Sequence, residues 1–256
     1  MTTIDIKGSV QRQFNQVAAN YSTSAVHAKG RDLEEMVKAV PLTGREQVLD
    51  AGCGTGHTAL AFAPHVDQVV GVDFTEGMLA QGRQLAADRG LTNVEFRLGD
   101  VEKLPFAGAQ FDLVVSRYSA HHWPHPRTAL HEFKRTLKPG GTFLLNDIVS
   151  FDDFTADTYL QAVELLRDPS HVRDHTVMQW TAMLTAAGFV DIGVIYSGSV
   201  WIDFVSWIQR MATPAANAEM IRTLFDGAPR EVKTALQIES NYNFAFTGAV
   251  IRARVG

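Results

Sequence analysis

A doubly wound α/β fold is predicted by three observations on this chain. Short apolar runs alternate with segments of helical spacing, which is typical of parallel strands joined by helices. The first run, 47–50, leads into a glycine-rich turn and then a helix-like segment, 58–66. Several of the runs end in a carboxylate. The sequence therefore predicts a seven-stranded, mostly parallel sheet with a helical N-terminal segment and a helical cap.

The N-terminal segment has two helical patterns ahead of the sheet. Apolar residues recur on one face of residues 9–19, and the polar stretch 20–22 is expected to end that helix. A second helix is expected over 25–40, ended by Pro41 and Gly44. We expect both helices to lie over the mouth of the following domain.

Strands are predicted where apolar residues alternate or form a short continuous run, and helices where apolar residues recur with a period of about 3.6 residues. The expected strands are 48–50, 68–73, 94–98, 111–116, 142–146, 190–196 and 243–252. The expected helices between them are 59–66, 75–89, 128–137 and 176–187. Lys138–Gly141 is expected to be a turn, and 151–175 has only a partial helical pattern.

About forty residues between the last two strands are rich in aromatic and apolar side chains at helical spacing. They are too apolar for a disordered linker, so a cap is predicted. The expected division is a helical lid (1–44), a core (45–199 and 240–256) and an inserted cap (200–239). Two uses are open for the side chains that stand out in the cap: a pocket for an apolar ligand, or the core of the cap itself. They are Trp201, Phe204, Trp207 and Met211.

Composition excludes several classes of protein. With 256 residues, 46% of them hydrophobic, the chain can bury a sizeable core. Its net charge of −5 and lack of a basic cluster argue against a nucleic-acid partner. A single cysteine, Cys53, fits a reducing compartment. No apolar signal core or run of about 18 apolar residues is present, so a cytoplasmic protein without a membrane span is expected.

The glycine turn and the strand-end acids point to a nucleoside-bearing ligand. Gly52, Gly54 and Gly56 let the backbone approach a ligand closely. Their G-x-G-x-G spacing differs from the G-x-G-x-x-G of dinucleotide enzymes, and the P-loop ending is absent. Asp73 follows Gly52 by 21 residues, a spacing that suits hydrogen bonds to both ribose hydroxyls, and Asp100 could accept from an exocyclic amine.

Four motifs together resemble a known family. They are V-L-D-A-G-C-G-T-G (48–56), V-V-G-V-D (69–73), G-D-V-E-K-L-P-F-A-G-A-Q-F-D-L-V-V-S (99–116) and L-K-P-G-G (137–141). The combination is similar to the class I S-adenosylmethionine-dependent methyltransferases, with their Rossmann-like fold. It resembles most the small-molecule branch of the ubiquinone and menaquinone C-methyltransferases, called type 11. The resemblance covers roughly residues 45–147.

The resemblance implies a role for each matching position. Asp50 and the three glycines of the turn would surround the methionine part of S-adenosylmethionine. Asp73 would bind the ribose, with Phe74 and Met78 beside it. Asp100 would meet the adenine amine and Val101 its ring. Ser116, Arg117 and Tyr118 would line the floor near the methyl group, Tyr21 would close the front, and Cys53 would serve in packing.

The sulfonium of this cofactor is already activated, so the protein needs to align the reactants, exclude water and take up a proton where the acceptor requires it. The candidate bases are His121 and His122, just after the fourth strand, with Tyr118 as a third candidate catalytic residue. The alternative is that these histidines cap a helix or line the pocket. No metal site is expected, and His171 and His175 are expected in a solvated loop. Asp147 would face the acceptor or cap a turn.

The function predicted from these residues is methyl transfer to a small, hydrophobic or aromatic metabolite. The alternatives are a nucleotide-dependent oxidoreductase and a non-catalytic module that binds S-adenosylmethionine. The acceptor atom, the need for a base and the oligomeric state, a homodimer included, stay open at this point.

Overall fold

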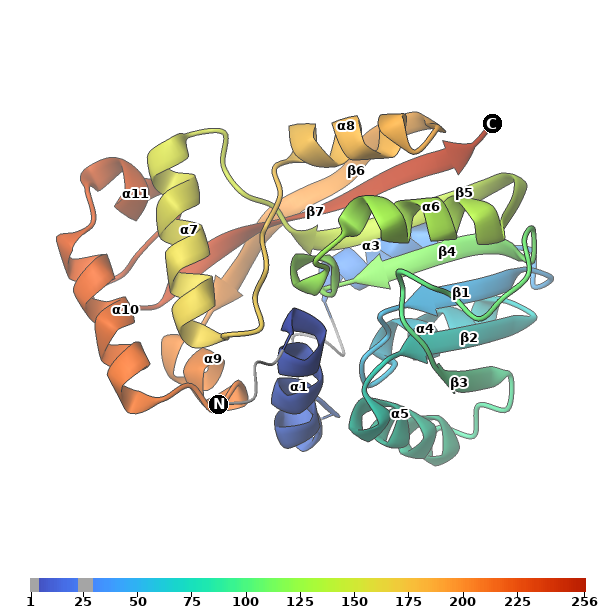
Figure 1. Ribbon diagram of the computed structural model, residues 1–256, viewed down its shortest axis with the longest axis horizontal. Coiled ribbons are helices and arrows are strands. Elements are labelled where there is room, and N and C mark those ends of the chain that lie inside the picture. The colour runs from blue at the N-terminus through green and yellow to red at the C-terminus, as the bar shows by residue number, and fades with distance from the viewer. Residues whose placement is uncertain (1–4, 23–29) are drawn as a thin grey trace.

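The protein is described by a computed structural model that covers residues 5–22 and 30–256, and the side chains of these residues except 19–22. Its strands are β1 (Gln47–Ala51), β2 (Gln68–Asp73), β3 (Val94–Leu98), β4 (Phe111–Arg117), β5 (Leu137–Ile148), β6 (Phe189–Ile202) and β7 (Phe244–Val255). They form one sheet in the order β3-β2-β1-β4-β5-β7-β6 (Figure 1). Only the two pairings made by β7 are antiparallel among the described strands. The predicted fold class is confirmed.

Helices cover both faces of the sheet because the central strands are apolar on both sides. On one face, α3 (Arg31–Lys38), α4 (His57–Phe62) and α5 (Glu76–Asp88) bury Met36, Phe62 and Leu79 against the strands. On the other face, α6 (Pro126–Thr136) and α8 (Val177–Ala186) bury Phe133 and Trp180. The strand ends that carry Asp50, Asp73 and Asp100 therefore come together at one edge of this layered core.

A cap stands on the extended ends of β5, β6 and β7. It consists of α9 (Phe204–Arg210), α10 (Ala215–Gly227), α11 (Arg230–Ala235) and also α7 (Phe154–Arg167), which lies beside α10 in Figure 1. Phe204, Trp207 and Met211 are buried, whereas Trp201 at the end of β6 is 48% exposed. Three of the four side chains singled out in the sequence thus belong to the interior of the cap, where Phe204 and Trp207 join its apolar cluster.

The N-terminal helix α1 (Ile6–Ser22) runs across the mouth between the sheet and the cap (Figure 1). The Gln13 side chain donates to the Met211 carbonyl (2.8 Å), and the Gly77 N–H donates to Asn15 (3.2 Å). The prediction that residues 20–22 end this helix was wrong, because it continues to Ser22. Of the second expected helix, α3 is described, and positions 25–29 lie outside the described residues.

Two strands are longer than their sequence patterns indicated. The expected turn Lys138–Gly141 is the start of β5, which tolerates Gly140 at φ +74°. Strand β6 runs on to Ile202, since it stays paired with β7 along its whole length in spite of two register shifts. The pairing with β7 satisfies the backbone hydrogen-bonding groups of β6. The polar, exposed side chains of β6 gave no sign in the sequence that the strand continues this far.

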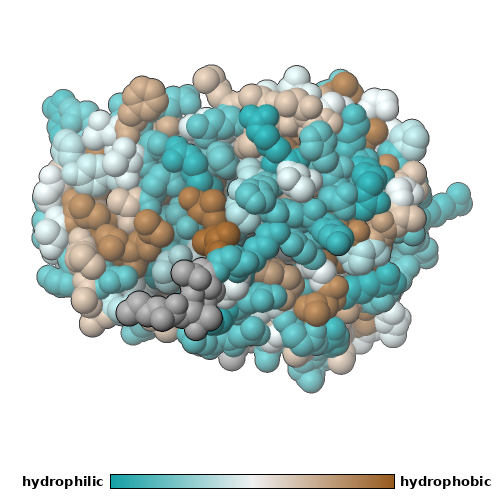
Figure 2. All heavy atoms as spheres, in the orientation of Figure 1, coloured by the Kyte–Doolittle hydropathy of each residue, from teal (hydrophilic) through white to brown (hydrophobic). Residues whose placement is uncertain are grey.

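The face shown in Figure 2 is mostly hydrophilic, with apolar side chains gathered over α7 and α10. The exposed apolar residues of these helices include Leu165 (53%) and Met220 (46%). Across the described ranges 5–22 and 30–256, no helix has the length and apolar character needed to cross a membrane.

Candidate functional site

The turn after β1 has a backbone path that only glycine suits. Gly52 (φ +71°) and Gly56 (φ +80°) are both in the left-handed region. A Cβ on Gly52 would lie 2.0 Å from Ser119 Oγ, and one on Gly56 would lie 2.5 Å from the Phe96 ring. The Gly52 N–H donates to the Val72 carbonyl at the end of β2 (2.8 Å). The turn is therefore held against β2, and Gly52 and Gly54 line the pocket described below with backbone that carries no side chain.

Asp73 ends β2 and closes onto this turn. Its carboxylate accepts hydrogen bonds from the Gly54 N–H (2.9 Å) and the Thr75 N–H (2.8 Å). Burial raises the pKa of Asp73, and these backbone donors oppose that rise because they favour the ionised form. The carboxylate also lines the pocket described below.

Asp50 lies beneath the turn and does not line the pocket. Asp50 as a whole is only 1% exposed. Its carboxylate accepts a hydrogen bond from the Ala59 N–H at the start of α4 (2.9 Å). Burial, together with the Asp73 charge, raises the pKa of Asp50 to about 7. Its contact is thus with the helix that follows the turn.

Asp100 lies two residues after the end of β3 and pairs with the N-terminal helix. Lys7 Nζ lies 2.6 Å from Asp100 Oδ2 and 2.6 Å from Glu102 Oε2. The Asp100 side chain remains 35% exposed. Lys7 therefore forms an ion pair with Asp100, the carboxylate that we expected to accept a hydrogen bond from an exocyclic amine.

These strand ends surround one hollow, here called the strand-end pocket, with about 910 Å³ of empty space including its open mouth. Of the predicted site residues, the pocket wall contains Gly52, Gly54, Asp73, Phe74, Met78, Asp100, Val101, Tyr118 and His122. Gly56, Asp50, Ser116 and His121 do not line it, and the side chain of Tyr21 lies outside the described part of the chain.

Ser116 and Arg117 at the end of β4 have different environments. Ser116 is buried, and its hydroxyl donates to the Ala51 carbonyl (2.7 Å), which ties β4 to β1. Arg117 lines the strand-end pocket, and its Nε donates to Asp32 of α3 (2.5 Å). The same Asp32 oxygen accepts from Asn146 (2.5 Å), so α3 is fastened to the strand ends by a buried polar group.

A second hollow, here called the cap-side pocket, lies between the sheet and the cap and has about 540 Å³ of empty space. Phe14, Tyr118 and His122 line both pockets, so these three side chains form the partition between them. The remaining wall contains His121, Ile148, Glu164, Arg167, Val200, Ile202, Trp207, Arg210 and Phe246. Trp207 therefore packs in the interior of the cap and also lines the cap-side pocket. These are the two positions that the sequence left open for the aromatic side chains of the cap.

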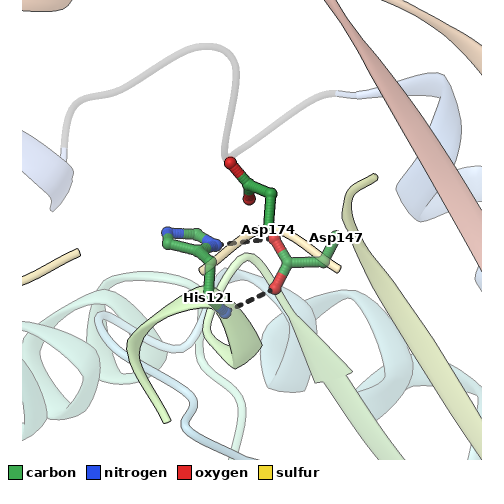
Figure 3. A group of neighbouring side chains, drawn as sticks. All are labelled: His121, Asp147 and Asp174. Carbon is green, nitrogen blue, oxygen red and sulfur yellow. Dashed lines mark hydrogen bonds and ion pairs between the residues drawn. The ribbon is translucent and has the colours of Figure 1, made fainter. Parts of the chain in front are cut away.

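His121 is held by Asp147 of β5 (Figure 3). Asp147 Oδ1 accepts from His121 Nδ1 (2.7 Å), and Oδ2 accepts from the Ala120 N–H (2.8 Å) at the start of the short helix η2 (Ala120–His122). Nε2 of the ring faces away from Asp147 in Figure 3. Burial lowers the pKa of His121, but the Asp147 carboxylate outweighs it and raises the pKa to about 9.

Asp147 and His121 lie beside the buried Asp174, with ligand-type atoms of all three within 4.8 Å. However, both oxygens of Asp147 are already used, because Oδ1 also accepts from the Ile148 N–H (2.8 Å) and Oδ2 from the His121 N–H (3.2 Å). With two donors on each oxygen, this carboxylate is arranged to orient an imidazole.

His122 and His171 are enclosed by the loop after α7. The Ser170 carbonyl faces His122 Nδ1 (3.1 Å), and the Gln161 side chain faces His171 Nε2 (3.0 Å). Burial and the neighbouring His121 charge lower the pKa of His122 to about 4 and that of His171 to about 2. The expectation that His171 lies in a solvated loop was wrong, since it is 5% exposed, while His175 is half-buried.

Two other predicted groups have little tendency to ionise. Burial, and then the charges of Asp50 and Asp73, raise the pKa of the Cys53 thiol. Burial likewise raises the pKa of Tyr118, whose backbone is at φ +50°. The sequence reading did not identify Lys7, Phe14, Glu102 or Trp123 as pocket residues. Glu102 follows Asp100 by two positions and was within reach of a sequence argument, whereas Lys7 lies 93 positions away.

The chain matches a family model described as "Methyltransferase domain" over residues 42–188. It is 38% identical to the uncharacterized methyltransferase YcgJ of Bacillus subtilis over 90% of both chains. The crystal structure of YcgJ superposes with a TM-score of 0.85 at 34% identity, covering 89% of this chain and 99% of that one.

A second relative is named after its substrate. Demethylmenaquinone methyltransferase of Clavibacter sepedonicus is 36% identical over 54% of this chain and 57% of its own length. Except for Lys7, Val10 and Phe14 of α1, the residues that line the strand-end pocket lie within the region matched by the family model. The chain belongs to the class I S-adenosylmethionine-dependent methyltransferases, in the type 11 branch, and its cofactor is S-adenosylmethionine.

Proposed function

We propose that this methyltransferase transfers the methyl group to a small, hydrophobic or aromatic metabolite bound in the cap-side pocket. The observation that carries the proposal is the shared partition of Phe14, Tyr118 and His122 between the two pockets. A donor on one side and an acceptor on the other would meet at these side chains, which suits direct in-line displacement.

The residues of the strand-end pocket fit the cofactor in this proposal. The missing side chain at Gly54 leaves open space for the methionine part, and Asp73 offers a carboxylate to the ribose hydroxyls. Asp100 and Val101 would hold the adenine, beside Phe74 and Met78. Bound there, S-adenosylmethionine supplies a methyl group that passes to the acceptor lone pair while the C–S electrons stay on sulfur, leaving S-adenosylhomocysteine.

His121 is the base that we propose for acceptors that lose a proton. Asp147 holds its Nδ1, so the opposite nitrogen, Nε2, would take the acceptor proton on the side of the cap-side pocket. His122 is less suited, because its Nδ1 faces the Ser170 carbonyl and its Nε2 lies 3.9 Å from Asp168. Tyr118 would act as a neutral wall between the reactants.

The segments outside the core would enclose the reaction. We propose residues 1–44 as a lid, since α1 contributes Lys7, Val10 and Phe14 to the strand-end pocket. Residues 200–239 would form the acceptor cap on the core of residues 45–199 and 240–256, helped by α7. The single cysteine supports a reducing, cytoplasmic setting for the enzyme.

An occlusion variant tests the assignment of the two pockets. Val200→Trp places an indole in the cap-side pocket, and Val205→Trp on the 52% exposed outer side of α9 is the matched control. Both variants should bind S-adenosylmethionine in calorimetry like the parent. With a panel of quinols, phenols and amines, only the control should release S-adenosylhomocysteine at the parent rate. Equal turnover by both variants would contradict the proposal, and turnover by no protein would favour the binding-module alternative.

A further inference from the structure

The wall of the cap-side pocket carries more positive than negative charge. Its cationic groups are Arg167, Arg210 and the imidazole of His121, whereas Glu164 is the one carboxylate among the described residues that line it. Arg167 Nη1 lies 3.8 Å from Glu164 Oε2, and the charge of Arg210 also acts on this carboxyl, so one acid faces two guanidinium groups. Burial raises the pKa of Glu164, which weakens its negative charge further.

The other acids near this wall do not line the pocket. Asp147 faces His121 and the backbone N–H groups of η2, and it does not line the pocket. Asp168 accepts from the backbone and hydroxyl of Ser170, and Asp174 is 2% exposed. A ligand in the pocket would therefore contact the cationic groups directly. It would be separated from these carboxylates by the residues that line the pocket.

The rest of the wall is apolar and partly aromatic. Ile148, Val200, Ile202 and Phe246 come from the long strands β5, β6 and β7, and Trp207 comes from α9. The Arg167 guanidinium lies over the Trp207 ring, 5.0 Å from its centroid, and its Nε donates to the Trp207 carbonyl (3.3 Å). The cation is thus fixed against an aromatic side chain, so the pocket presents guanidinium groups beside apolar surface.

We propose that the methyl acceptor is an amphipathic carboxylic acid, whose carboxylate binds at Arg210 and Arg167 while its apolar body lies on Ile148, Val200 and Phe246. This inference rests on the proposed function and narrows its substrate class. An arginine can bind a carboxylate through two parallel N–H···O bonds, which fixes orientation as well as adding affinity. The partition of Phe14, Tyr118 and His122 lines the same pocket, so an acceptor anchored by its acid end would share this space with the side chains nearest the methyl donor.

A matched pair of probes tests the charge preference in the full-length protein saturated with S-adenosylhomocysteine. Naphthalene-2-carboxylate and naphthalene-2-carboxamide have nearly the same shape and differ in charge. Calorimetry should show the carboxylate binding at least about tenfold more tightly at low salt, with the advantage falling as salt rises. Arg210→Gln should abolish the advantage, and Arg210→Lys should keep part of it. The control Arg222→Gln, on α10 with its guanidinium over Phe204, should leave the advantage unchanged.

The readouts separate this inference from the proposed function. Equal binding of the two probes, no binding of the carboxylate, or an unchanged advantage in Arg210→Gln would overturn the acidic acceptor. None of these results would affect a parent enzyme that still binds S-adenosylmethionine and loses turnover in Val200→Trp. Failure of the occlusion test would instead remove the proposed acceptor pocket itself.

Discussion

Asp73 Oδ2 accepts the Gly54 N–H at 2.9 Å, so the end of β2 is closed onto the turn after β1. The same carboxylate is the one assigned to the ribose of the cofactor. In the proposed binding mode the ribose hydroxyls and the turn would share one acceptor group, which would link cofactor binding to the conformation of the turn.

Asp73→Asn should weaken S-adenosylmethionine binding by roughly 10–100-fold, the range expected for losing hydrogen bonds to a charged acceptor. Calorimetry measures the affinity directly. Asp67→Asn is the matched control, because Asp67 is an exposed carboxylate at the other end of β2 that pairs with the Gln47 side chain (2.6 Å). An affinity in Asp73→Asn equal to that of the control would remove Asp73 from the binding site.

For a hydroxyl acceptor, kcat should rise with pH until about 9. The Asp147 carboxylate raises the pKa of His121 to about 9, so the imidazole carries a proton at neutral pH and becomes a base only as that proton leaves. Asp147→Asn should shift the rising limb to lower pH, because the charge that stabilises the imidazolium is gone. His121→Asn should remove the limb and lower kcat by about 10²–10⁴-fold.

Steady-state rates across pH 6 to 10 give these profiles. A role for Asp147 in structure alone would lower the rate at every pH and leave the midpoint in place. Such a result, or a normal profile in His121→Asn, would contradict the assignment of the base.

Acid should destabilise the fold through His171 as the pH falls below about 6.5. Burial lowers the pKa of His171 to about 2, and an unfolded histidine titrates near 6.5. A depressed folded pKa gives stability that is present above pH 6.5 and is lost as pH falls toward the folded value. The loss can reach about 1.4 kcal/mol per pH unit for each such imidazole.

Urea unfolding at pH 7, 6 and 5 measures this slope. His171→Gln should flatten it, because the neutral amide can still donate to Gln161 and takes up no proton. His65→Gln, at an exposed position at the end of the short helix η1 (Ala63–His65), is the control and should keep the slope of the parent. Identical slopes in all three proteins would show that His171 does not couple folding to pH.

Salt should speed the association of S-adenosylmethionine. Lys7 Nζ bridges Asp100 and Glu102 at 2.6 Å each, so the adenine amine has to replace this ion pair. Screening weakens a half-exposed pair, and stopped-flow association should become several-fold faster between low and high ionic strength. Lys7→Met should associate fast at every salt concentration. A salt dependence that survives in Lys7→Met would place the barrier elsewhere.

The strand ends were predictable because sequence spacing alone brings them together. Once β1, β2 and β3 are parallel neighbours, Asp73 and Asp100 must share an edge of the sheet, and the structure places both in one pocket. Asp50 belongs to the same pattern, yet its carboxylate turns inward to the Ala59 N–H. Which way a strand-end side chain turns depends on the next helix, and the spacing does not contain that information.

The length of β6 and the surroundings of His121 could not be predicted in the same way. The strand β6 is exposed along much of its length, so its extension to Ile202 has no apolar signature and depends on pairing with β7. His171 follows α7 in a polar stretch, and its burial results from contacts with Gln161 and with the histidines after β4. For Asp147 the sequence left two roles open, facing the acceptor or capping a turn. The structure shows it capping η2 and holding His121, and it does not line the cap-side pocket.

The position of α1 also decides where a purification tag belongs. This helix supplies Lys7, Val10 and Phe14 to the strand-end pocket, so a fusion partner joined ahead of it would load the element that covers the cofactor. The carboxyl end, after β7, lies at the opposite end of the sheet from the cap in Figure 1. A purification tag, dye or surface linkage at Gly256 should therefore leave α1 and the strand-end pocket unobstructed.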